Sequence, residues 1–349
     1  MNDIEKKQYY LVSKTKKYFK FLKLKGIDLS KSSLCYLSTY GINPGHANLL
    51  IWLNKKNSIF FFLRIILKHL FAISSFYNYQ SSKLKTKKFK NIFICWGRKK
   101  NFKKEYYQDD FLNIRSDKAK NSLFFVILID NKKPIKIPKN VVVFYKKNKS
   151  RSILFLISTT FYLLIKYNFN FRKIFHYLSS QTVFAELINN KILEIHKRFK
   201  FNQVILPYEG QPFQNYLFKN LKKLNVNTIG IIHSILPALP LNLMKRDGSP
   251  DKIYISGVQQ KKILVKLCGW KKNEILLNKS LRLKYGYDKR IIGSIFFPIN
   301  LNKIDKLINN FENLVCNSKI IKYPKLKIRN HPQMKDSLIH KILEKEFRE

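Results

Sequence analysis

The sequence predicts an α/β protein built around a parallel, doubly wound sheet. From residue 91 onward, short apolar runs alternate with amphipathic segments, and strands that alternate with helices are typical of such a sheet. The clearest example is residues 203–234, which read as strand, helix and strand. We expect two α/β units, at 86–287 and 288–349, after a basic helical lead-in over residues 1–85.

The lead-in is rich in lysine, is broken by turn residues at 40–45, and ends in a polar, basic segment at 81–90 that indicates a linker. The first unit then opens with apolar runs that each end in turn or polar residues, which predicts strands. These strands are expected at 91–96, 123–129 and 141–145. Two helices are expected next, at 151–168 and 171–199.

The middle of the first unit is predicted to be a β-α-β element. Val204, Ile205 and Leu206 form a buried strand that Pro207 ends. The helix that follows is indicated by apolar residues at helical spacing: Phe213, Leu217, Leu221 and Leu224. A second strand is expected at 227–232, and a further strand and helix at 252–256 and 258–268.

The second unit is predicted as β-α-β-α. Strands are expected at 290–297 and 326–329, with helices at 301–315 and 337–347. A unit of roughly 60 residues cannot bury both faces of a sheet, so we expect this unit to be incomplete.

The formal charge of +47, from 68 Lys and Arg against 21 Asp and Glu, leaves two interpretations open. A basic patch could neutralise nucleic-acid phosphates. However, lysine is spread along the chain together with abundant Ile, Asn, Phe and Tyr, which indicates biased composition, and no zinc-finger, RNP or bZIP pattern is present. We therefore expect no nucleic-acid partner, but we do expect adhesion to anionic surfaces such as the inner leaflet of a membrane.

The cysteines and the apolar segments concern the cellular compartment. Four scattered cysteines without a CxxC pair indicate free thiols in a reducing compartment. No secretory signal is recognised at the start of the sequence. The apolar stretches 58–77 and 153–165 are interrupted or too short for a clean membrane span, so each is either a core helix or an interfacial helix. We expect a cytoplasmic protein that contacts the inner face of the membrane peripherally.

Polar residues follow the predicted strands at their carboxyl ends, where ligands bind in open α/β sheets. Tyr208, Glu209 and Gly210 follow one strand, and His233 and Ser234 follow the next. A carboxylate and an imidazole facing one crevice can act as general acid and base, or grip a sugar or phosphate. We expect weaker contributions from other residues, namely Gln211, Gln214, Ser256, Lys327 and Arg329.

The sequence lacks the patterns of several other enzyme classes. It has no GxGxxG fingerprint, no GxxxxGK[ST] loop and no GxSxG elbow. No histidine pair has metal-ligand spacing, so no metal site is predicted. Taken singly, Glu-Gly, His-Ser and His-Pro are also typical of ordinary turns, and only their order along the chain favours a site.

These motifs resemble those of GT-B glycosyltransferases, which are built from two Rossmann-like domains. Glu209-Gly210 resembles the acidic-Gly motif of bacterial sialyltransferases, and His331-Pro332 resembles their His-Pro motif. The stretch YEGQPFQ followed by IGIIHS is also similar to a family of bacterial surface carbohydrate (capsule polysaccharide) biosynthesis proteins. Only one acidic residue precedes Gly210, and the Ser/Thr pair that follows the His-Pro motif in sialyltransferases is not found before residue 349.

The resemblance implies a metal-independent transferase with no cofactor. Its substrates would be a nucleotide sugar, CMP-linked or diphosphate-linked, and a glycan or lipid-linked glycan acceptor. Glu209 would be the general base, and His331 would contact the donor phosphate. Two alternatives stay open: a truncated, inactive paralogue, and a non-enzymatic basic protein that binds membrane or nucleic acid.

Overall fold

The computed structural model describes residues 3–32, 79–84, 89–130, 133–146, 157, 161–162, 164–166, 168–170, 176–177, 180–233, 240–278, 293–296 and 326–329. The chain divides into two compact units, Met1–Leu283 and Lys284–Glu349.

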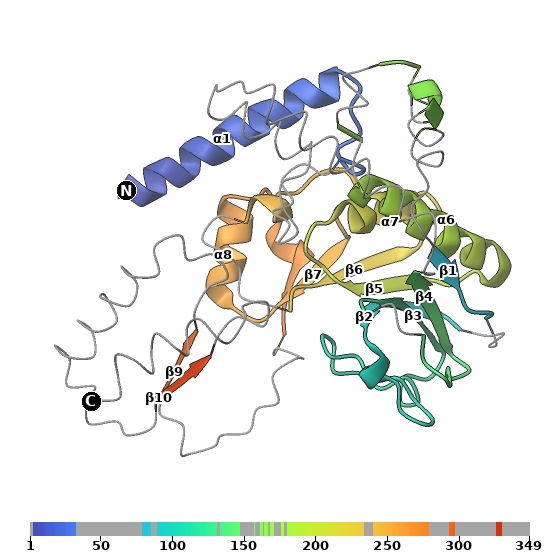
Figure 1. Ribbon diagram of the computed structural model, residues 1–349. Coiled ribbons are helices and arrows are strands. Elements are labelled where there is room, and N and C mark those ends of the chain that lie inside the picture. Colours follow the sequence, from blue (N-terminus) through green and yellow to red (C-terminus); the bar gives the residue numbers. More distant parts are fainter. Residues whose placement is uncertain are drawn as a thin grey trace, which may run out of the picture. The chain divides into compact units, whose positions relative to one another are not determined.

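The first unit is built on an eight-stranded sheet with the order β1-β4-β3-β2-β5-β6-β7-β8 (Figure 1). Neighbouring strands are parallel throughout, except that β1 pairs with β4 in the antiparallel direction. The strands are β1 (Tyr79–Ser81), β2 (Asn91–Gly97), β3 (Ser122–Leu128), β4 (Val141–Lys146), β5 (Gln203–Pro207), β6 (Asn227–Ile231), β7 (Lys252–Ile255) and β8 (Ile275–Leu277). The predicted α/β class and parallel sheet are confirmed.

The strand order reverses at one place in the sheet. The chain runs outward from β2 to β3 and β4, then crosses back to β5 and continues outward through β6, β7 and β8. This is the order of doubly wound sheets, and their ligand crevice opens where the order reverses, outside the carboxyl ends of the strands. The switch point of this protein therefore lies between β2 and β5.

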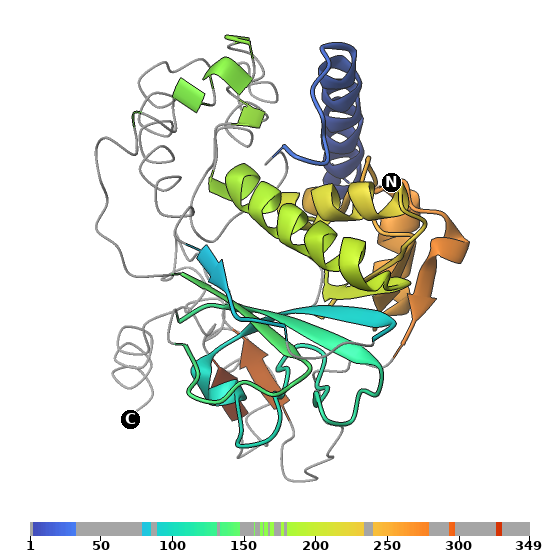
Figure 2. The same ribbon diagram turned by 90° about the vertical axis from the view of Figure 1, so that its right-hand side faces the viewer.

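One face of the sheet is covered by helices, as Figure 2 shows for α6 and α7. The described helices are α1 (Asp3–Leu24), α6 (Ser180–Phe199), α7 (Pro212–Lys222) and α8 (Val258–Lys266). They bury apolar residues against the same cluster, including Leu22, Ile188, Leu217 and Leu264. Parallel strands covered in this way become continuously apolar, as in β3, where every residue is buried.

The opposite face is covered near β2, β3 and β4 by the irregular connection between β2 and β3. Tyr107 and Leu112 from this connection pack with Phe93 and Phe124 of the sheet. The connection contains one short helical turn, η1 (Lys99–Asn101). Two further turns lie elsewhere in the unit, η2 (Leu241–Leu243) and η3 (Lys272–Glu274).

Most predicted elements of the first unit are confirmed, with three differences. β1 and β8 were not predicted, because strands of three residues carry too little pattern. The helix predicted at 171–199 is described continuously only from Ser180 to Phe199, as α6. Leu224 does not belong to the apolar face of α7: the helix ends at Lys222, Asn225 adopts a positive φ of 56°, and Leu224 is 46% exposed.

The second unit contains the parallel pair β9 (Gly293–Phe296) and β10 (Leu326–Arg329). Both strands were predicted, and parallel pairing is what a β-α-β connection requires. The helices predicted at 301–315 and 337–347 lie outside the described residues, as do Cys35, Cys316 and the apolar stretch 58–77. Among the helices that the structure describes, none has the length and apolar character needed to cross a bilayer.

Cys95 and Cys268 are free thiols, and both are buried, as expected for these two residues. Burial raises the pKa of Cys268 to about 12, so this thiol stays protonated and unreactive at neutral pH.

Candidate functional site

The strongest candidate site lies at the carboxyl ends of β5 and β6, next to the switch point. Glu209 follows β5, and His233 lies two residues after β6. The Nε2 atom of His233 is 3.6 Å from Oε1 of Glu209, so the predicted proximity of the two side chains is observed. At this distance the two groups form an ion pair when the imidazole is protonated.

The backbone that carries Glu209 is held by Gln214, which is buried in the first turn of α7. Oε1 of Gln214 accepts hydrogen bonds from the backbone N–H groups of Glu209 (2.9 Å) and Gln211 (3.0 Å). Its Nε2 donates to the carbonyl of Pro207 at 2.7 Å. One amide thus fixes both sides of the turn. Gln214 is only 1% exposed, so its amide is not presented to an acceptor hydroxyl in this conformation, contrary to what the sequence suggested.

The other side of the turn is held by the segment after β6. Nδ2 of Asn242 donates to the carbonyl of Glu209 at 2.7 Å, and the guanidinium of Arg246 donates to the carbonyl of Gly210 at 2.6 Å. Gly210 has a φ of +69°, and a Cβ at this position would lie 2.0 Å from the carbonyl oxygen of Asn242. Glycine is therefore required by both the backbone conformation and the close approach.

Tyr208, predicted as a binding residue, instead stabilises the turn from its buried side. Its side chain is 1% exposed, and its hydroxyl donates to Oδ1 of Asn215 at 2.7 Å. Nδ2 of Asn215 in turn donates to the carbonyl of Gly210 at 3.0 Å. Tyr208 therefore packs in the core and presents no surface to a ligand in this conformation.

The carboxylate of Glu209 is the polar group that this turn presents outward. Its side chain is 40% exposed, and Oε2 accepts a hydrogen bond from Nε2 of Gln211 at 2.7 Å. Burial raises the pKa of Glu209, while the hydrogen bond from Gln211 acts in the opposite direction. A fixed carboxylate with a raised pKa is a better proton acceptor than an ordinary surface glutamate.

His233 is held in place by an aromatic contact. The imidazole ring of His233 packs against the ring of Phe111 in a T-shaped arrangement, with the two centroids 4.6 Å apart. The His233 side chain is only 7% exposed. Phe111 belongs to a turn organised by the buried carboxylate of Asp109, which accepts hydrogen bonds from the N–H groups of Phe111 (2.9 Å) and Leu112 (2.5 Å). The irregular β2–β3 connection therefore contributes one wall of the site.

The other predicted residues lie at the end of β7, in the second unit, or outside the described residues. Ser256 is exposed at the end of β7. Arg329 is the last residue of β10, in the second unit, two residues after Lys327. Ser234, His331 and Pro332 lie outside the described residues.

Four residues that shape the site were not predicted as such: Phe111, Asn215, Asn242 and Arg246. Three of them lie in connections that are far from Glu209 in the sequence and lack the apolar periodicity of a helix or strand. These are Phe111, Asn242 and Arg246. Gln214 and Asn215 did have a local signal, since polar residues that directly follow a helix N-terminus often bond to the preceding turn.

Two other features bear on ligand binding. No cluster of three or more metal-ligating side chains occurs among the described residues.

A cavity of about 740 Å³ opens at the amino ends of β3 and β4, lined by residues such as Lys104, Lys136 and Asn140. This is the edge of the sheet opposite Glu209, so the cavity is separate from the candidate site.

No protein-family model matches the chain, and no curated protein matches it significantly.

Proposed function

We propose that this protein is a glycosyltransferase of surface polysaccharide synthesis, which moves a sugar from a nucleotide-activated donor to a glycan or lipid-linked glycan. The observation that carries the proposal is the fixed carboxylate of Glu209, with its raised pKa, beside His233 at the switch-point edge of a doubly wound sheet. This is the edge at which such sheets bind ligands.

In the proposed reaction, Glu209 takes the proton of an acceptor hydroxyl. The acceptor oxygen then bonds to the anomeric carbon, and the bond between that carbon and the donor phosphate breaks. The nucleotide leaves with the electron pair as a phosphate anion. His233 orients the acceptor and, when protonated, stabilises the ionised Glu209.

Cationic groups are needed where charge develops on the leaving phosphate. Arg98 and Lys99 follow β2 on the other side of the switch point, and Arg98 is exposed. The resemblance of His331-Pro332 to a donor-phosphate motif adds a second source of such contacts. An arginine can hold a phosphate through two parallel hydrogen bonds.

The test is the release of nucleotide from a panel of CMP-, UDP-, GDP- and dTDP-sugars by the full chain, compared with Glu209→Gln. General-base removal is expected to lower turnover by roughly 10²- to 10⁴-fold. The isosteric change should leave the melting temperature nearly unchanged, because the amide oxygen of the new glutamine can still accept the hydrogen bond from Gln211.

A thermal-shift screen with the free nucleotides supplies the control. A nucleotide at a hundredfold excess over its Kd should stabilise the chain by about 2.7 kcal/mol. Absence of both turnover and any thermal shift, in a chain that melts cooperatively, contradicts the proposal.

A further inference from the structure

We propose that the first unit carries a membrane-docking surface for anionic phospholipid, made of the exposed basic face of α1 and an apolar stripe at residues 157–169. This docking surface does not depend on the proposed transferase activity. It combines one basic and one apolar exposed surface, and both are anchored to the same carboxylate.

The apolar stripe consists of large hydrophobic side chains that remain more than half exposed: Ile157, Phe161, Tyr162, Ile165 and Phe169. Residues 157, 161–162 and 164–166 are helical, and a spacing of four residues places Ile157, Phe161 and Ile165 on one side of a helix. Clustered exposed apolar residues of this size mark protein or membrane contact sites.

The basic face of α1 is the side that does not pack on the core. Val12, Tyr18 and Leu22 are buried, whereas lysines fill the exposed side: Lys6, Lys7, Lys16, Lys17, Lys20 and Lys23. Tyr10 (57% exposed) and Leu24 (78% exposed) lie among them. The sequence contains no acidic residue between Lys7 and Lys25.

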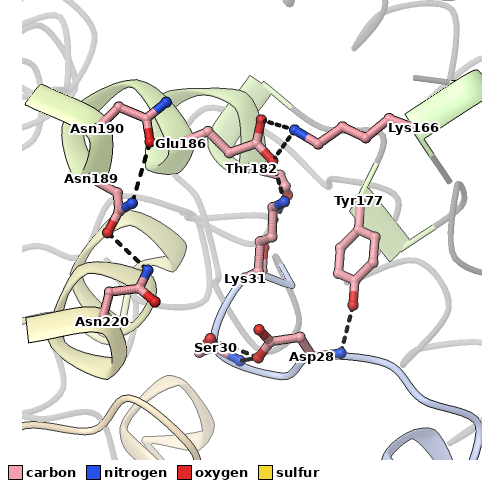
Figure 3. Close-up of polar contacts among 10 residues, drawn as sticks. All are labelled: Asp28, Ser30, Lys31, Lys166, Tyr177, Thr182, Glu186, Asn189, Asn190 and Asn220. Atoms are coloured by element: carbon pink, nitrogen blue, oxygen red, sulfur yellow. Dashed lines mark hydrogen bonds and ion pairs between the residues drawn. The ribbon is translucent and has the colours of Figure 1, made fainter. Parts of the chain in front are cut away.

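Glu186 on α6 ties the two surfaces together, as Figure 3 shows. It forms ion pairs with Lys31, which lies just after α1, and with Lys166 in the apolar segment (2.8 Å to Oε2). The turn after α1 is fixed further by Asp28, whose N–H donates to the Tyr177 hydroxyl at 2.5 Å and whose carboxylate pairs with Lys219 at 3.0 Å. Both surfaces therefore belong to one anchored assembly on the helical side of the sheet.

A bilayer fits this combination of surfaces. Lysines attract anionic headgroups, while aliphatic and aromatic side chains enter the acyl boundary. Tyrosines with a nearby cation suit the interface between the two, and Lys14 lies 4.5 Å from the ring of Tyr10, and Lys166 lies 5.3 Å from that of Tyr162. A nucleic acid would use the lysines but leave the apolar stripe in water.

The experiment is co-sedimentation of the full chain with vesicles of mixed phosphatidylglycerol and phosphatidylcholine, and with vesicles of phosphatidylcholine alone, at physiological salt. Binding is expected only to the anionic vesicles. Each lysine near the surface contributes about a fivefold gain in affinity, so K16E/K17E/K20E/K23E should weaken binding at least roughly a hundredfold. F161S/I165S should weaken it by about tenfold or more, because inserted apolar area is lost.

Matched variants at other positions show whether vesicle binding depends on this surface or only on the net charge and the total exposed apolar area of the chain. K118E/K120E/K136E/K139E changes the same charge at four exposed lysines, and I135S/V258S removes two exposed apolar side chains, which are 90% and 57% exposed. Both controls should bind vesicles nearly as well as the unaltered chain.

Three results would overturn the proposal. Equal losses in the two lysine variants would mean that binding follows net charge alone. Tight binding of duplex DNA or RNA that F161S/I165S leaves unchanged, without vesicle binding, would identify a nucleic-acid surface. Vesicle binding unaffected by F161S/I165S, together with a lower melting temperature or a changed oligomeric state, would mean that another part of the chain or a second copy covers the stripe.

Discussion

Glu186 and Glu209 are both partly buried carboxylates, yet their surroundings differ in charge. Glu186 lies between two lysines, Lys31 and Lys166, whereas Glu209 is hydrogen-bonded by the neutral amide of Gln211. Burial acts to raise the pKa of both groups. For Glu186 the two lysines outweigh burial and lower the pKa, and for Glu209 burial prevails and the pKa is raised.

The difference shows how one type of side chain serves two purposes. A carboxylate with cationic partners is held ionised and joins elements together, as Glu186 joins α6 to the segments at 31 and 166. A carboxylate without a fixed cation can take a proton more readily. The side chains of Gln214 and Asn242 form hydrogen bonds with the backbone N–H and carbonyl groups of Glu209 instead of with its carboxylate. The following predictions test this contrast, beginning with the largest expected effect.

Removing the charge of Glu186 should destabilise the fold. In Glu186→Gln two lysine ammonium groups lose their anionic partner at a site where the Lys31 and Glu186 side chains are 10% and 17% exposed. Breaking such a pair costs about 3 kcal/mol. Urea unfolding should show this loss, while Glu209→Gln should change the free energy of unfolding by less than about 0.5 kcal/mol. Equal effects of the two variants would contradict the contrast.

Gly210→Ala should distort the turn that carries Glu209. Alanine at a positive φ, with its Cβ against a backbone carbonyl, is expected to cost about 2 kcal/mol. Gly257→Ala is the matched control, because Gly257 has an ordinary φ of −124° and its nearest neighbour is the flexible side chain of Gln260 at 3.3 Å. Thermal unfolding should separate the two variants, and similar melting temperatures would show that the turn is not constrained as described.

Acid should weaken the Glu186 anchor. Its folded-state pKa lies below the ordinary value of 4.5, so the stability it contributes is present above that pH and is lost as the pH falls toward the folded-state pKa. Asp28 and Asp251 should add to this loss of stability in acid. Burial acts to raise their pKa values, but their hydrogen bonds and lysine partners outweigh it and lower them. Melting temperature against pH should therefore fall below about pH 4.5, and the fall should be shallower in Glu186→Gln. A parallel fall in both proteins would argue against Glu186 as the anchor.

Gln211→Ala should have the smallest effect. Loss of the amide that lowers the pKa of Glu209 leaves burial unopposed, so the pKa rises further. Below the optimum, the pH–turnover profile should move to higher pH by a fraction of a unit, with little loss of stability. A shift toward lower pH would show that Gln211 does not stabilise the ionised carboxylate.

Much of the fold could be predicted because its strands are apolar runs that end in proline, glycine or polar residues. The same pattern placed Glu209 and His233 at neighbouring strand ends and hence close together. The sequence could not show that Tyr208 turns into the core, since a tyrosine after a strand suits either side of the chain. Nor could it show that Asn242 and Arg246 hold the turn, because those contacts join residues 33 and 36 positions apart.

The most direct test of the contrast is a carbon-13 NMR titration of the side-chain carboxyls of Glu186 and Glu209 in one sample of the full chain, assigned with the two Gln variants. We expect the pKa of Glu209 to lie above the ordinary value of 4.5 and the pKa of Glu186 to lie below it. Coincident midpoints, or the reverse order, would contradict the assignment of Glu209 as a proton acceptor and of Glu186 as a structural anion.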